Sequence, residues 1–423
     1  MNLRSKLFGN TGIYLGANIL NAGIPFLLLP ILTRVLTPAD YGTVAMFGIV
    51  LSVLAAFTGL SVHGAVGVRY FQLEKTELAE YVGACIGILV ISTSLIFLLV
   101  AANGTWLEGI TGVPSDWILV AVVLSGLQFL GMIRLSLWQV SGEVKKYGVF
   151  QITQSLLNAA VSLVLILMVG MAWEGRVLGQ SVAVTFFGVV ALWWLLRDGL
   201  LLFRGNWRVH YRDALKFGVP LIPHVIGGLL IVAADRFIIV KLLDLTQAGI
   251  YTVALQVGQV ISLVTSSFNA AYSPWFMGKL SKPSEVIRRN IVRGTYLYYV
   301  LVITCAVIFG VTAPMFLHLF VGESYRAAGE LVIYIALGFA FGGCYYMVVG
   351  YVFFESKTGV LAFITFVSGL VNIPLMFILV EHNGVAGAGQ AFVLTQAFSF
   401  LATWWVAHKV HPMPWLYAPK ANR

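Results

Sequence analysis

The ionisable residues best placed to do chemistry in this chain lie inside apolar segments. Asp235 and Arg236 are neighbours, and aliphatic or aromatic residues precede and follow them, while Arg134 lies within another apolar segment. In such surroundings a guanidinium group can hold phosphate oxygens bidentately. A carboxylate can exchange a proton or a sodium ion, or simply neutralise the neighbouring arginine. Because a buried charge is costly, we interpret these residues as functional candidates, with a local salt bridge as the alternative for Arg236.

The composition indicates that these apolar segments cross a membrane. Only 10% of the 423 residues are charged, 59% are hydrophobic, and the mean hydropathy is +0.91. A water-soluble fold needs more charge to cover its surface. Apolar runs of roughly 20 residues, each long enough to cross about 30 Å of hydrocarbon, recur along the chain. We therefore predict an all-α polytopic membrane protein with about 12 transmembrane helices. The predicted spans are 11–32, 42–62, 82–102, 117–139, 148–169, 176–196, 217–242, 248–270, 294–314, 329–354, 359–380 and 385–406.

Lysine and arginine are distributed unevenly between the two sides of this arrangement. Twenty of the 26 fall on the side of the N-terminus, and five fall on the opposite side. Cytoplasmic loops carry such an excess of positive charge, so both termini are expected in the cytoplasm. The net charge of +9 follows mainly from this topology, and it gives no reason to expect a nucleic-acid partner.

Two segments half a chain apart resemble one another. Residues 36–46, LTPADYGTVAM, and residues 245–255, LTQAGIYTVAL, are identical at six of eleven positions without a gap. This offset of 209 predicts two six-helix lobes in the same orientation, related by a pseudo-two-fold axis along the membrane normal, with a cavity between them. The predicted domains are 1–196 and 214–423, joined by a basic cytoplasmic linker, 197–213. Parallel repeats of this kind are typical of transporters.

The first predicted span of each half contains two prolines. These are Pro25 and Pro30 in 11–32, and Pro220 and Pro223 in 217–242. A proline removes one hydrogen bond from a helix and can bend it. We interpret these residues as candidates for gating, with a static kink as the alternative.

Four other cations are also candidates, and each has a simpler alternative. Arg134 lies about five residues from the cytoplasmic end of its span, where its side chain could instead reach the surface. Arg69 follows a glycine-rich extension of the second span and could be a first cytoplasmic contact for a substrate or a surface residue. Arg34 and Lys241 lie at periplasmic span ends, where a cation suits an exit site or anchors the helix at the interface.

Five stretches of the sequence have a distinctive pattern: 27–42, LLLPILTRVLTPADYG; 217–224, FGVPLIPH; 234–239, ADRFII; 249–251, GIY; and 274–276, PWF. These stretches resemble the Wzx-type oligosaccharide flippases of the multidrug/oligosaccharidyl-lipid/polysaccharide exporter superfamily. The other spans match only in layout. The resemblance implies a twelve-helix transporter that moves an undecaprenyl-diphosphate-linked oligosaccharide from the cytoplasmic to the periplasmic leaflet. The context would be O-antigen (lipopolysaccharide) or related glycan assembly in the bacterial inner membrane.

The resemblance also suggests roles for the candidate residues. A diphosphate at membrane depth needs fixed cations, and the substrate-binding candidates are Arg236, Arg134, Arg69, Arg34 and Lys241. Asp235 is the candidate for coupling to H⁺ or Na⁺. The expected partners are the lipid-linked oligosaccharide, membrane lipids and other glycan-assembly membrane proteins.

Two competing functions make different demands on the sequence. A cation-coupled drug exporter of the same fold predicts an acidic, aromatic cavity, whereas a flippase predicts a basic one. A polymerase or ligase of the same pathway would be an enzyme and would need a large periplasmic loop, but the longest predicted periplasmic segment, 103–116, is short. No nucleotide-binding loop, metal-ligand spacing or catalytic triad is present in the sequence, and the three cysteines lie inside apolar runs. We expect no cofactor, no metal and no catalysis.

Overall fold

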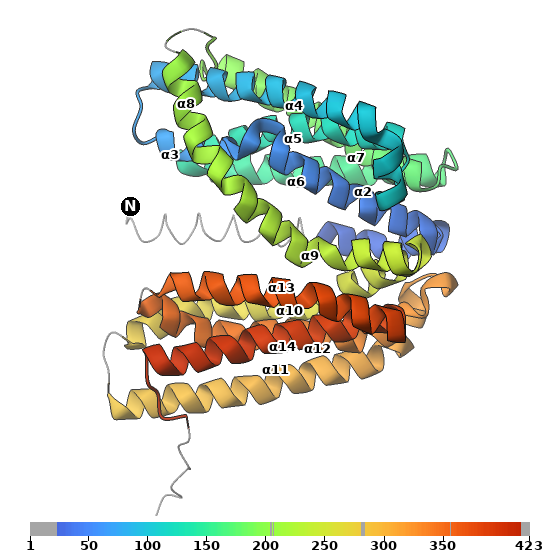
Figure 1. The fold of residues 1–423 in the computed structure, drawn as a ribbon, viewed down its shortest axis with the longest axis vertical. Coiled ribbons are helices and arrows are strands. Elements are labelled where there is room, and N and C mark those ends of the chain that lie inside the picture. Colours follow the sequence, from blue (N-terminus) through green and yellow to red (C-terminus); the bar gives the residue numbers. More distant parts are fainter. Residues whose placement is uncertain (1–22, 204, 206, 281–283, 356, 416–423) are drawn as a thin grey trace, which may run out of the picture. The chain divides into compact units, whose positions relative to one another are not determined.

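The structure is a computed structural model that describes residues 23–203, 205, 207–280, 284–355 and 357–415 (Figure 1). Within these ranges every regular element is a helix. The first is a short helix, Gly23–Val35. The others are α2 Pro38–Phe57, η1 Thr58–Ser61, α3 His63–Arg69, α4 Lys75–Thr111, α5 Ser115–Val140, α6 Val144–Leu167, α7 Trp173–Arg197, α8 Trp207–Gly218, η2 Val219–Leu221, α9 Ile222–Leu242, α10 Leu245–Leu280, α11 Glu285–Phe320, η3 Glu323–Tyr325, α12 Ala328–Phe354, α13 Thr358–Asn383 and α14 Val385–Val410.

Ten helices in the described part of the chain are long and apolar enough to cross a membrane. They correspond to the second to sixth and the eighth to twelfth predicted spans. The first predicted span, 11–32, lies partly outside the described residues and overlaps the helix Gly23–Val35. The seventh corresponds to α9. The chain is therefore an all-α polytopic membrane protein, as predicted.

In three places the helices continue well beyond the predicted spans. The spans 82–102, 248–270 and 294–314 lie inside α4, α10 and α11, which have 37, 36 and 36 residues. At 1.5 Å per residue such helices are about 55 Å long, whereas the hydrocarbon core is about 30 Å thick. Hydropathy marks only the part of a helix that meets hydrocarbon, so it cannot locate ends beyond the membrane.

The internal contacts divide the chain into two units, Met1–Ala233 and Ala234–Arg423, with the boundary inside α9. In the first unit, α5 packs against α2, α4 and α7, and α6 packs against α7. In the second unit, α12 packs against α10, α11 and α14, while α13 packs against α14. The predicted linker, 197–213, includes the beginning of α8, which packs against α3 and α4.

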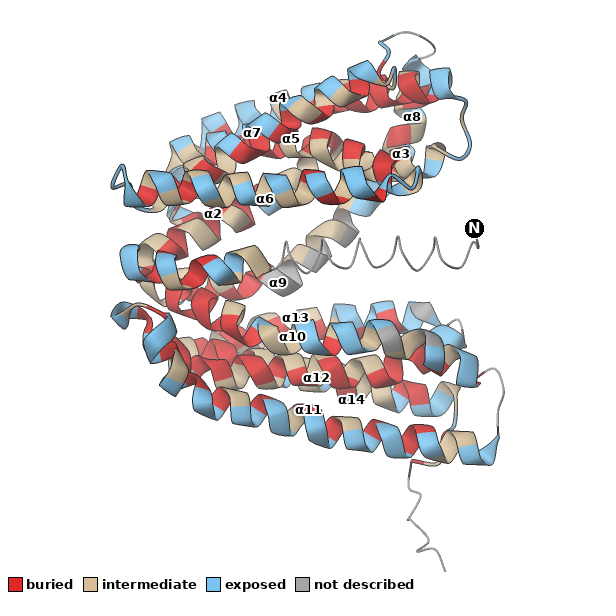
Figure 2. Ribbon diagram, turned by 180° about the vertical axis from the view of Figure 1, so that it is seen from behind, coloured by how far each residue is buried: buried red, intermediate tan, exposed pale blue. Residues whose placement is uncertain are grey.

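The central helix of the second unit is α12, and most of its residues are buried (Figure 2). Glycines allow its neighbours to approach closely. A Cβ atom on Gly310 of α11 would overlap the backbone of Ile333, and one on Gly338 would overlap the ring of Phe392 on α14. Helices in a membrane gain their association from this kind of close packing, because lipid is as apolar as the helix surfaces.

Helix α2 ends in a tight turn, η1. Gly59, Leu60 and Ser61 all have positive φ angles, 71°, 48° and 57°. The Ser92 hydroxyl accepts a hydrogen bond from the Gly59 backbone N–H at 2.8 Å, and the Thr58 hydroxyl donates one to Ser125 at 3.0 Å. Side chains of neighbouring helices thus satisfy polar groups of a broken helix, as such a break requires.

Helices α6 and α7 are held together at Gly179. A Cβ atom at this position would lie 2.6 Å from the backbone nitrogen and 2.8 Å from the Cα of Ser162. These atoms belong to the main chain of α6 and cannot move aside as the end of a flexible side chain can. The absence of a side chain at Gly179 therefore sets the distance between these two helices.

We predict that Gly179→Ala destabilises the first unit, because the added methyl group must push α6 and α7 apart. Overpacking of this kind typically costs about 1–3 kcal/mol. The measurement is the thermal stability of the purified protein in detergent. The matched control is Gly48→Ala in α2, where no heavy atom lies within 4 Å of the added Cβ, so no loss is expected. Equal stability of the two variants would contradict the close approach of α6 and α7.

Candidate functional site

Asp235 and Arg236 form a buried pair of opposite charges on α9, six residues before its end at Leu242. The Asp235 Oδ1 accepts hydrogen bonds from the Arg236 backbone N–H at 2.8 Å and from its Nη1 at 3.4 Å. Asp235 is only 8% exposed, and the Arg236 side chain is 11% exposed. The structure therefore keeps both charges out of water within one turn of α9.

The hydroxyl of Tyr251 on α10 belongs to the same polar cluster. It lies near enough to Asp235 and Arg236 to interact electrostatically with both, and Tyr251 is fully buried. Tyr251 belongs to the repeated segment 245–255 of the sequence. The Asp235–Arg236 pair thus lies beside the first turns of α10. In the sequence, only the family resemblance connected the segments 234–239 and 249–251.

Arg134 on α5 is the most buried candidate cation, with 3% of its side chain exposed. Its Nη2 donates a hydrogen bond to Asp198, which follows α7. Its guanidinium carbon lies 4.5 Å from the ring centroid of Trp138 and 5.7 Å from that of Trp194. The side chain is therefore held by an ion pair and two aromatic rings and does not extend to the surface.

A pocket of about 440 Å³ surrounds this arginine, between the ends of α4, α5, α6 and α7. Its lining carries the cations Arg134, Lys75 and Lys146 and the carboxylates Glu143 and Asp198. The Lys146 ammonium lies 3.3 Å from Glu143, and the buried Nε of Arg134 has no hydrogen-bond partner. A small anion in this pocket would meet more positive than negative groups.

Arg69 holds a neighbouring helix in place. Its Nε and Nη2 donate to the two carboxylate oxygens of Asp213 on α8 at 2.9 Å and 2.6 Å, and the Tyr81 hydroxyl donates to the same carboxylate at 3.0 Å. Burial alone would raise the pKa of Asp213, but these hydrogen bonds and the positive charge of Arg69 hold that pKa below its ordinary value. The carboxylate therefore stays charged at neutral pH, and only acid below its ordinary pKa of 3.8 would weaken this contact.

The remaining cations lie at helix ends. Arg34 is exposed near the end of the helix Gly23–Val35. Lys241 is exposed in the last turn of α9, and its ammonium lies 5.8 Å from the ring centroid of Phe377 on α13. Arg134 and Arg69 contact different carboxylates, so the structure does not bring them into one cluster.

The four prolines lie in three kinds of position. Pro25 and Pro30 fall inside the helix Gly23–Val35, which continues through both. Pro220 lies in η2, where α8 has ended and α9 has not begun, so the chain is interrupted there. Pro223 is in the first turn of α9, and its side chain is outside the described residues.

A second polar pocket, of about 350 Å³, lies between α5, α6 and α7 and was missed by the sequence analysis. Four of its residues follow one face of α6 at helical spacing: Gln151, Gln154, Ser155 and Asn158. The signal that could have found them is this i, i+3, i+4, i+7 pattern of polar residues in an apolar helix. The residues carry no charge that would mark them, because amides are neutral.

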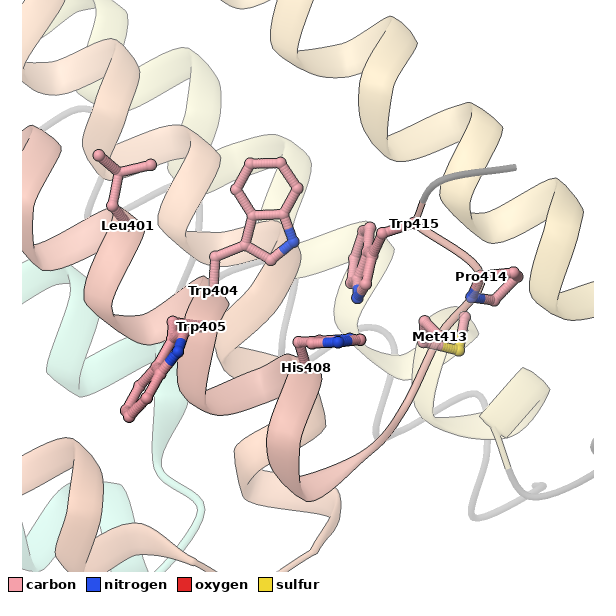
Figure 3. Close-up of a pocket in the computed structure, with 7 residues that line it drawn as sticks. All are labelled: Leu401, Trp404, Trp405, His408, Met413, Pro414 and Trp415. Atoms are coloured by element: carbon pink, nitrogen blue, oxygen red, sulfur yellow. The ribbon is translucent and has the colours of Figure 1, made fainter. Parts of the chain in front are cut away.

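A third pocket, of about 640 Å³, lies at the end of α14 (Figure 3). Trp404, Trp405 and His408 line it from α14, and Met413, Pro414 and Trp415 line it from the segment that follows. The Tyr296 hydroxyl donates to the Trp415 backbone oxygen at 2.7 Å, and Lys409 lies 3.8 Å from the ring centroid of Trp405. Aromatic rings beside a lysine at a helix end are typical of a membrane interface.

Among the described residues, no group of three His, Cys, Asp or Glu side chains could hold a metal ion.

The comparison with known proteins assigns a family. The family described as "Polysaccharide biosynthesis protein" matches residues 7–278, which is more than half of the chain. The "Lsg locus putative protein 1" of Haemophilus influenzae is 24% identical over 398 residues, covering 90% of this chain and 95% of that protein. An "Uncharacterized membrane protein" of the same organism is 23% identical over 371 residues, covering 86% and 88%.

Solved structures with a similar fold include a lipid II flippase and multidrug transporters. The inward closed conformation of the lipid II flippase MurJ has a TM-score of 0.70 at 14% identity, covering 94% of this chain and 87% of that one. The inward-facing conformation of a multidrug resistance MATE family transporter of the MOP superfamily has a TM-score of 0.65 at 16% identity, covering 93% and 94%. At these identities the likeness shows the fold, and that fold is the one the sequence resemblance predicted. Taken with the match over residues 7–278, the membrane helices and the fold lead to one assignment: this chain belongs to the polysaccharide biosynthesis protein family.

Proposed function

We propose that this protein is a flippase that moves an undecaprenyl-diphosphate-linked oligosaccharide, such as an O-antigen unit of lipopolysaccharide, between membrane leaflets. The observation that carries the proposal is membership of the polysaccharide biosynthesis protein family combined with a fold similar to that of a lipid II flippase. The cargo moves from the cytoplasmic to the periplasmic leaflet of the bacterial inner membrane, by alternating access. Both termini are cytoplasmic, and the protein performs no catalysis.

The charged residues at membrane depth favour this function over export of a cationic drug. Among the candidate residues, Arg134, Arg236 and Lys241 are basic and Asp235 is acidic, while Asp198 at the end of α7 pairs with Arg134. Arg134 is buried, and 11% of the Arg236 side chain is exposed. A diphosphate needs such fixed positive charges, whereas a cationic drug would be repelled by them. The drug exporter remains the second candidate because the MATE transporters share the fold.

In this proposal Arg236 in the second unit and the Arg134 pocket in the first unit are two separate contact points for a diphosphate, while Arg69, Arg34 and Lys241 act where the cargo enters and leaves. The prolines Pro25, Pro30, Pro220 and Pro223 mark helices that bend during the cycle. Asp235 is the buried carboxylate that would couple transport to H⁺ or Na⁺ in this proposal, and it lies beside Arg236. Other glycan-assembly membrane proteins would supply and consume the cargo.

We predict that Arg236→Ala lowers transport of a lipid-linked oligosaccharide at least about ten-fold, the effect of losing one charge-assisted hydrogen bond of roughly 1.4 kcal/mol. The measurement uses proteoliposomes and an added lectin that detects glycan in the outer leaflet. The matched control is Arg326→Ala, since Arg326 is exposed and pairs with the neighbouring Glu323. Full transport by Arg236→Ala, at normal protein content, would remove Arg236 from the site.

The Arg134 pocket permits a test that separates binding from folding. Arg134→Ala leaves Asp198 without its partner, so the single variant loses stability whether or not Arg134 binds phosphate. We predict that the double variant Arg134→Ala/Asp198→Ala regains thermal stability but not transport. Recovery of both properties together would show that Arg134 acts only as the partner of Asp198.

We predict that Asp235→Asn makes transport independent of the ion gradient, because an amide cannot take up a proton and holds a sodium ion less firmly than a carboxylate. The measurement compares transport with and without ionophores that collapse the proton and sodium gradients. The wild-type protein should slow on their addition, and the variant should not respond. An equal response of both would exclude Asp235 from coupling.

A further inference from the structure

We infer that the amide-lined pocket between α5, α6 and α7 is a subsite for one neutral sugar unit of the cargo. The inference rests on the proposed flippase function and adds a part of the site that the charged residues do not provide. Its volume of about 350 Å³ is at the small end of the range for small-molecule pockets, about 300–1,000 Å³. It therefore suits a single sugar unit better than a whole oligosaccharide.

The pocket concentrates amide groups from three helices. Gln151, Gln154 and Asn158 come from α6, Gln128 comes from α5, and Gln180 comes from α7. All five side chains are partly exposed, so a ligand can reach them. Each amide offers both a donor and an acceptor, which is the combination that the hydroxyl groups of a sugar require.

The uncharged lining of the pocket suits a neutral ligand better than a diphosphate or a cationic drug. None of the residues that line it is charged, so it offers nothing to neutralise a diphosphate or a cationic drug. Phe150 and Phe187 form part of its wall, with ring centroids 4.9 Å apart in an edge-to-face arrangement. Their apolar surfaces suit the C–H groups of a sugar ring, while the amides suit its hydroxyls.

The hydrogen bonding of the amides leaves capacity for a ligand. The buried Oε1 of Gln151 has no hydrogen-bond partner. In the described part of the chain, no hydrogen bond joins Gln128, Gln154 and Gln180 to one another. An acceptor buried without a partner is unfavourable, and a rotation of the partly exposed Gln151 side chain toward a ligand hydroxyl would relieve this cost.

Arg176 of α7 positions one of these amides. Its Nη1 donates to the Oδ1 of Asn158, and to the Ser162 hydroxyl at 3.0 Å. Because the Asn158 oxygen is taken by Arg176, its NH₂ group remains as a donor at the edge of the pocket. The arginine contributes to orientation here and does not line the pocket itself.

The first arm of the test measures binding of the sugar alone. Saturation-transfer NMR on the purified protein uses a mixture of glucose, galactose and N-acetylglucosamine as the probe. The variants are Gln154→Leu and Gln180→Leu, with Gln154→Asn to keep polarity while shortening the amide. The control is Gln139→Leu, an exposed glutamine in the last turn of α5 that does not line the pocket. We expect sugar signals for the wild type and the control, and their loss in the three variants at unchanged thermal stability.

The second arm compares transport of two lipids, undecaprenyl diphosphate with and without its oligosaccharide. The variants should lower transport of the glycan-bearing lipid roughly ten-fold and leave that of the bare lipid unchanged. Absence of sugar signals in the wild type, or equal signals in wild type and variants, would overturn the subsite. A wild-type protein that gives these sugar signals but moves neither lipid would instead overturn the proposed function and leave the subsite standing.

Discussion

The cost of a polar group in hydrocarbon is the constraint on which the rest of this structure depends. A charge at membrane depth is tolerated only when it is paired or faces a polar pocket. Arg134 pairs with Asp198 and lies against two tryptophan rings. Arg236 pairs with Asp235. Arg176 donates hydrogen bonds to Asn158 and Ser162. Each polar group therefore marks a place where neighbouring helices have adapted to it, and these places are where a polar cargo can be bound.

The same constraint explains how the helices pack. Because hydrophobic burial hardly favours contact between helices in lipid, close approach of their backbones has to supply the stability. Gly179 between α6 and α7, and Gly310 and Gly338 on or beside α12, allow that approach. The close contact of α6 with α7 in turn forms part of the wall of the amide-lined pocket, so packing and binding share one region of the first unit.

Much of the fold could be predicted from the sequence, because each span needs about 20 apolar residues and the composition shows them directly. The ends of α4, α10 and α11 could not, since those helices continue where hydropathy no longer reports on structure. Asp235, Arg236 and Arg134 stood out as charges in apolar segments. The partner of Arg134, Asp198, lies 64 residues away, and no pattern in the sequence links the two. The amides of α6 are predictable from their helical spacing, although they carry no charge that sets them apart from the surrounding residues.

The most direct test of the central claim is whether the wild-type protein alone moves a lipid-linked glycan across a bilayer. Proteoliposomes would carry an undecaprenyl-diphosphate oligosaccharide in the inner leaflet, and a lectin outside would report its arrival, with protein-free vesicles as the reference. We predict arrival well above the reference rate, with no reduction when a cationic drug is present in excess. A rate equal to that of the protein-free vesicles, together with proton- or sodium-driven export of the drug, would contradict the account and assign the fold to drug transport.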